Sequence, residues 1–108
     1  MSGQKNVFFG DYVRELRNSR KLPLRKLASE LDIDPSTLGK IERSSRKPPQ
    51  EIIAKLSQIF DIDIHTLKTI YLTDKISKEI IEEGFDKDIL SDVEHKVDIL
   101  KKRAPLHT

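Results

Sequence analysis

Residues 24–43, LRKLASELDIDPSTLGKIER, constrain the fold of this chain more than any other stretch. A turn-like segment, Asp32-Ile33-Asp34, separates two apolar patterns. On either side of it, apolar residues recur three and four positions apart, as on one face of a helix: Leu24, Leu27, Ala28 and Leu31 before it, Leu38 and Ile41 after it. The sequence therefore predicts two short helices joined by a tight turn.

The residues of the turn sharpen this prediction. Asp is among the few residues other than Gly that tolerate a left-handed backbone, which suits Asp32 at the point of reversal. Asp34 is expected to accept a hydrogen bond from the next turn as an N-cap, and Pro35 suits the first helical position. The small Ala28 lets the second helix lie close across the first. These features predict a helix-turn-helix whose second helix starts at Pro35.

The second helix has a short, polar and basic face that we expect to be exposed. It has no bulky apolar group, which suits a helix that enters the major groove of DNA. A solvated helix face is the alternative, but the turn next to it favours the DNA interpretation. The residues of this face are Ser36, Thr37, Gly39, Lys40 and Arg43.

The distribution of charge agrees with a polyanionic partner for the first half of the chain. The formal net charge of the 108 residues is only +2. Residues 1–50 contain 11 Lys and Arg against 6 Asp and Glu, whereas residues 51–108 contain 9 against 12. The basic excess therefore lies on the half that holds the helix pair.

Composition also narrows the class of protein. The chain has no Cys, so it has no disulfide or thiolate chemistry. Its apolar runs are too short for a signal peptide or a membrane span, so we expect no membrane association and cytoplasmic residence. The histidines His65, His95 and His107 lack metal-ligand spacing, and four Gly leave no room for a phosphate-cradling loop. We therefore predict no enzyme activity, catalytic residue, metal or cofactor.

Periodicity predicts further helices around the central pair. Helix one should run from Phe8 to near Arg20, and a positively charged loop, SSRKPP, should cover residues 44–49. Two more helices are expected over residues 50–60 and 64–72. Between these two helices lies Asp61-Ile62-Asp63, which repeats the residues of the central turn and is expected to be a turn as well.

Beyond residue 73 the chain becomes acidic and amphipathic. Thr73 or Asp74 is expected to cap a new helix that Gly84 stops, and residues 86–103 should form another. We expect two domains, residues 1–73 and a C-terminal extension over residues 74–108. The apolar stripes of the extension should bury against the core or against a partner subunit, which would make it a dimerisation element.

Residues 9–72 resemble the Cro/cI-type helix-turn-helix family, also called the XRE family. The motifs that carry the resemblance are FGDYVRELR, LRKLASELDID, STLGKIER and RKPP. The resemblance implies an all-α fold: a five-helix, lambda-repressor-like domain, here followed by two additional helices. It also implies sequence-specific binding of double-stranded DNA by a transcriptional regulator, of the repressor or restriction-modification controller type.

The resemblance assigns roles to particular residues. Those expected to read base edges are Pro35, Ser36 and Lys40, with Thr37 and Gly39 beside them. Those expected to grip the DNA backbone are Arg43, Arg46 and Lys47. Arg17 and Glu42 should form a structural pair between helix one and the recognition helix, residues 35–43. The chain departs from the family in Pro23-Leu24, which opens the scaffold helix without a capping hydroxyl, and in Pro35, which replaces a long polar reader.

Partners follow from the same interpretation. We expect a homodimer that binds an inverted-repeat operator. The alternative is a protein-interaction module, an antitoxin or adaptor, that holds a protein partner through residues 74–103. Retention on random duplex DNA at low salt, compared with co-purification of a stoichiometric protein, distinguishes the two.

Overall fold

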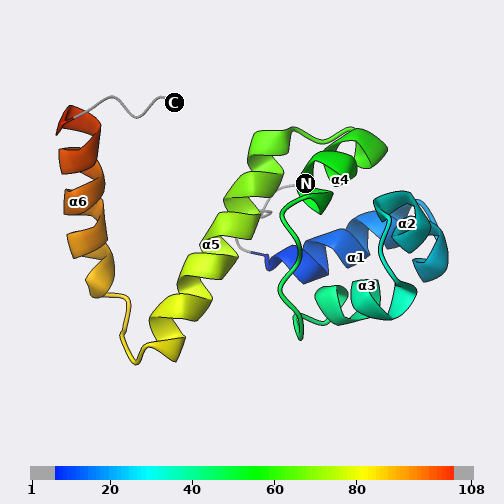
Figure 1. Ribbon diagram of the computed structural model, residues 1–108, viewed down its shortest axis with the longest axis horizontal. Helices are drawn as coiled ribbons and strands as arrows, with labels where there is room; N and C mark the ends of the chain where they lie inside the picture. Colours follow the sequence, from blue (N-terminus) through cyan, green and yellow to red (C-terminus); the bar gives the residue numbers. More distant parts are fainter. Residues whose placement is uncertain (1–6, 104–108) are drawn as a thin grey trace. The chain divides into compact units, whose positions relative to one another are not determined.

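The computed structural model describes residues 7–103, and every regular element among them is an α-helix (Figure 1). The predicted all-α class is therefore confirmed. The chain divides into two compact units, one ending at Asp74 and the other starting at Lys75. The helices are α1 (Phe9–Ser19), α2 (Leu24–Leu31), α3 (Pro35–Glu42), α4 (Ile52–Phe60), α5 (Ile64–Glu82) and α6 (Ile89–Arg103). Helix α4 starts two residues later than predicted, and α6 three residues later.

The first unit buries one apolar core. Helix α3 packs against both α1 and α2, and α2 also packs against α4. Figure 1 shows α3 lying along α1. The ring of Phe9 meets that of Tyr71 edge-on, with 5.6 Å between centroids, which attaches α5 to α1. The largest fully buried side chains include Phe9, Val13, Leu27, Leu31, Leu38, Ile41, Ile52, Leu56, Leu67 and Ile70.

Helices α1 to α4 are each followed, within two residues, by a residue other than Gly with a left-handed backbone. These residues are Lys21, Asp32, Ser44 and Asp61, with φ between 53° and 61°. After each of them, the next N–H donates to a carbonyl five residues back, as in Ile33 N to Ala28 O at 3.0 Å. This is the Schellman arrangement, which satisfies carbonyls at a helix end. The left-handed position of Asp32 is the one that the sequence predicted, and Asp61 lies in the second turn that the sequence predicted.

The prediction of a separate helix starting at Thr73 or Asp74 is wrong, because α5 continues through both residues. The Thr73 hydroxyl donates to Thr69 O at 2.8 Å, within α5. Asp74 does cap a helix, but a different one. Its Oδ2 accepts from Phe9 N, in the first turn of α1, at 2.7 Å. A carboxylate there also suits the positive end of the α1 dipole.

The second unit contains the end of α5 and all of α6. Gly84 follows α5 with a φ of 83°, in agreement with the predicted stop. Helix α6 has no buried residue. Large apolar side chains of this unit are exposed, among them Ile76, Ile81, Phe85, Leu90, Val93, Val97 and Leu100. Within residues 7–103, no helix is long and apolar enough to cross a membrane.

Candidate nucleic-acid interface

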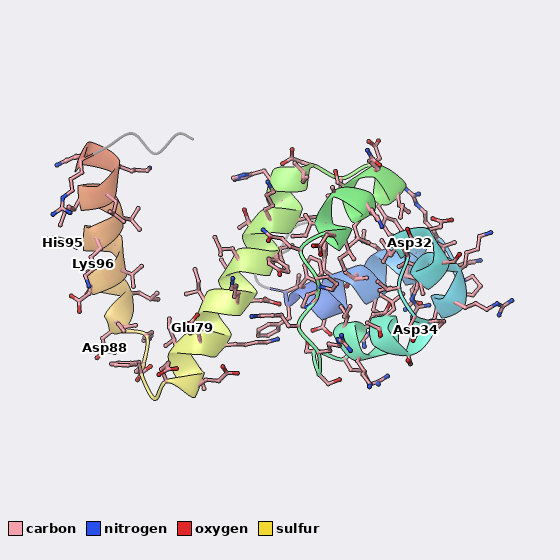
Figure 2. All side chains as sticks on the ribbon, in the orientation of Figure 1. Asp32, Asp34, Glu79, Asp88, His95 and Lys96 are labelled. Carbon is pink, nitrogen blue, oxygen red and sulfur yellow. The ribbon has the colours of Figure 1, made fainter. Side chains whose placement is uncertain are left out.

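The turn between α2 and α3 sets the position of the candidate interface. Asp32 adopts φ 60° and ψ 41°, and Asp34 then returns to extended backbone before Pro35 opens α3. Figure 2 labels both aspartates beside this turn. The Asp34 side chain makes no capping hydrogen bond, so that part of the prediction is wrong. The matching Asp63 does cap α5, because its Oδ2 accepts from Thr66 N at 3.2 Å.

Helix α3 has one buried face and one exposed face. Leu38, Ile41 and Glu42 are buried, whereas Pro35, Ser36 and Lys40 are exposed. Thr37 lies between them and is half-buried. Ser36 and Lys40 lie one helix turn apart and make this exposed face polar and basic. The major groove of DNA is wide enough to admit an α-helix.

Gly39 is buried, although the sequence predicted that it would be exposed. Neighbouring side chains cover it: a Cβ at this position would lie 3.3 Å from Nη1 of Arg43 and 3.7 Å from Cδ2 of Leu24. The Arg43 guanidinium therefore lies back along α3 over Gly39, towards the start of α2. The small residue at 39 makes room for this arrangement.

Arg17 and Glu42 form the structural pair between α1 and α3. Arg17 Nε donates to Glu42 Oε2 at 2.8 Å, and Nη2 donates to Oε1 at 3.0 Å, so the contact is bidentate. Arg17 Nη1 also donates to Leu22 O at 2.9 Å. The hydrogen bond to Glu42 raises the pKa of the Arg17 guanidinium above its ordinary value. The pair fixes α3 against α1 and orients its exposed face.

A glycine that sequence analysis missed lets α1 approach the end of α3. A Cβ at Gly10 would meet Ile41 O, and it would lie 2.8 Å from Glu42 O. Both atoms belong to the backbone, which cannot move aside as a side chain can. The only signal in the sequence is a Gly inside a helical pattern, where a close backbone approach is one of several explanations.

The cationic loop after α3 is held at both ends. At its start, Ser45 N donates to Lys40 O at 2.9 Å. At its end, the Tyr71 hydroxyl of α5 donates to Pro48 O at 3.0 Å. Arg46 and Lys47 are exposed between these two points. The loop therefore carries two cations next to the C-terminal end of α3, where Arg43 adds a third.

A helix-turn-helix family model matches residues 13–67, which is half of the chain and includes both helices of the pair. The chain belongs to the helix-turn-helix family. It is of the XRE type, a class of DNA-binding transcriptional regulators that are typically non-enzymatic. This membership favours DNA binding over the alternative of a protein-interaction module. In the described part of the chain, no group of three His, Cys, Asp or Glu could hold a metal ion.

The chain is similar to a curated relative and to a solved structure. One is the uncharacterized HTH-type transcriptional regulator YobD of Bacillus subtilis (strain 168), 29% identical over 79 residues, which cover 69% of each chain. The other is a solved structure, the SinR protein/SinI protein complex, with 21% identity and a TM-score of 0.49 over 89% of this chain and 100% of that one.

Proposed function

We propose that this chain binds an inverted-repeat operator in double-stranded DNA as a two-fold dimer and regulates transcription from it, as a repressor or a restriction-modification controller. Helix α3 enters the major groove. The observation that carries the proposal is the exposed polar and basic face of α3, whose opposite face is anchored in the core. Beside that face lie the cations of the loop, Arg46 and Lys47.

Within the proposed interface, residues divide by the part of the DNA that they reach. Ser36 and Lys40 read base edges, and Lys40 donates to O6 or N7 of a guanine. Pro35 supplies an apolar contact, and Thr37 lies at the margin because it is half-buried. Gly39 has no side chain and is covered, so it contributes space rather than a direct reading contact. Arg43, Arg46 and Lys47 bind phosphates and fix the register of α3.

The dimer is proposed to form through residues 74–103. The apolar side chains of this segment are exposed at helical spacing, as expected of a surface that a second copy covers. A two-fold dimer presents two copies of α3, and each half of an inverted repeat then receives one.

The test compares two cations with different proposed roles, Lys40 and Arg46. Lys40→Ala should cost about 1–3 kcal/mol on the best operator and little on random DNA, because a base contact discriminates whereas a phosphate contact does not. Arg46→Ala is the matched control, since it removes the same charge but should weaken binding equally on both DNAs. Fluorescence anisotropy with the two duplexes measures this. Equal losses for Lys40→Ala on both duplexes would remove Lys40 from the base-reading set.

A further inference from the structure

Helix α6 has an apolar stripe that reads the same from either end. Leu90, Val93, Val97 and Leu100 are spaced three, four and three residues apart, with leucines outside and valines inside. All four are between 40% and 50% exposed. A reversed copy of α6 would therefore match the stripe in four layers, with Leu90 of one copy against Leu100 of the other.

The charges at the two ends of this region have opposite sign. The acidic bend, residues 79–92, carries six carboxylates and one Lys, for a net charge of −5. The basic end, residues 101–103, is Lys101, Lys102 and Arg103. The charged side chains of both segments are exposed, and Figure 2 labels Glu79 and Asp88 within the acidic bend. Residues 93–100, between them, carry a net charge of only −1.

Stabilisation of the helices themselves explains only part of this pattern. Asp92 in the first turn of α6 and the cations in its last turn suit the dipole of α6. Glu79 and Glu82, however, lie in the last turn of α5, where the dipole is negative and a carboxylate is unfavourable. Lys75 and Lys78 lie one helix turn before Glu79 and Glu82 and offset part of this cost, but residues 75–92 still carry a net charge of −3, which a cationic surface would complement.

The start of α6 in the same chain cannot supply a cationic surface to the end of α5. Glu79, Glu82 and Glu83 precede the connection to α6, and Asp86, Asp88 and Asp92 follow it. Folding the start of α6 onto the end of its own α5 would bring these two acidic groups together, and like charges at such distances repel.

We propose that two copies of the chain pair antiparallel through α6, so that the basic end of each lies beside the acidic bend of the other. The inference rests on the proposed dimer and specifies its orientation. When the four apolar layers are aligned, residue 101 of one copy is level with residue 89 of the other, which is within one helix turn of Asp92 and directly follows Asp88. A parallel pair would instead place the two acidic bends side by side and the two basic ends side by side.

The first test neutralises the basic end. The variant K101Q/K102Q/R103Q should dimerise about tenfold more weakly than the unmodified chain near 0.1 M salt, because each dimer loses two sets of exposed ion pairs. The matched control, K21Q/R25Q/K26Q, removes the same charge from exposed positions of the first unit and should leave dimerisation unchanged. Sedimentation equilibrium gives the dimer dissociation constant of each.

The salt dependence then tests the orientation by its sign. Raising NaCl from about 0.1 M to about 1 M shortens the Debye length from ~10 Å to ~3 Å. Antiparallel pairing predicts that the unmodified dimer weakens over this range more than the K101Q/K102Q/R103Q dimer does. A dimer that strengthens with salt, or a variant as tight as the unmodified chain, would overturn the orientation and leave the dimer. A monomer at every concentration would overturn the dimer as well.

Discussion

At the scale of single residues, the Arg17–Glu42 pair links α3 to α1. The Glu42 side chain is 5% exposed and that of Arg17 is 15% exposed. Among the hydrogen bonds of the described residues, the Glu42 carboxylate accepts only from Arg17, whereas Arg17 also donates to Leu22 O. Because the carboxylate is deeper and has fewer alternatives, loss of the Arg should be the more damaging change.

This asymmetry is measurable in a double-mutant cycle. Arg17→Met should lower the free energy of unfolding by about 3–5 kcal/mol, since it strands a buried charge. Glu42→Leu should cost less, because Arg17 keeps its bond to Leu22 and lies nearer to water. The double variant should cost much less than the sum of the two. Urea unfolding gives all three values, and small additive effects would mean that the pair does not hold α3.

The residue scale also shows where sequence reasoning stops. Asp32 could be placed in a left-handed turn because Asp tolerates that backbone, whereas for Asp61 the sequence predicted only a turn. Lys21 and Ser44 adopt the same backbone without any such signal, because the hydrogen bonds of the helix end impose it on them. The helical spacing of Gly39 predicts an exposed position. The structure differs because Leu24 and Arg43 cover Gly39, which spacing alone does not show.

At the scale of elements, the approach of α1 to α3 depends on Gly10. Gly10→Ala would gain about 1 kcal/mol from helix propensity, but its Cβ would meet two carbonyls of α3. Overpacking of this kind costs about 1–3 kcal/mol, or more against backbone that cannot move aside. We therefore expect a net loss of about 2 kcal/mol of stability, with α3 displaced.

Gly39→Ala is the matched control for Gly10→Ala. Its Cβ would meet the end of the flexible Arg43 side chain at 3.3 Å, which can shift at little cost. Stability should therefore be unchanged or rise by up to about 1 kcal/mol from helix propensity. Thermal and urea unfolding measure both variants. Equal stabilities of the two would contradict the close approach of α1 to α3.

The continuity of α5 shows why element boundaries were harder to predict than elements. Thr73 and Asp74 are residue types that begin helices, and the pattern could not show that Thr73 bonds within α5 and that Asp74 caps α1. Thr69 O accepts the hydrogen bond of the Thr73 hydroxyl, and Asp74 accepts the N–H of Phe9, 65 residues away in sequence. The local periodicity of a sequence carries no information about a long-range contact such as that of Asp74 with Phe9.

At the scale of the whole molecule, the proposed function requires two copies of the first unit. Specific binding exceeds non-specific binding by about 4–10 kcal/mol. One short helix with Ser36 and Lys40 as its readers supplies too few base contacts for this, at about 1–3 kcal/mol for each good bidentate contact. Two helices related by a two-fold axis double the contacts and impose symmetry on the site.

Selection of bound sequences from a random DNA pool tests the central claim most directly. The full-length chain should enrich an inverted repeat whose half-site centres are roughly 10 base pairs apart, because two recognition helices must meet the same face of the duplex. The variant V93D/V97D, with charges in the α6 stripe, should enrich single half-sites. The variant H95D/I99D is its control, because it adds the same charge to exposed α6 positions outside the stripe, the acidic bend and the basic end. Recovery of an unenriched pool, or of sites without two-fold symmetry from the unmodified chain, would contradict the account.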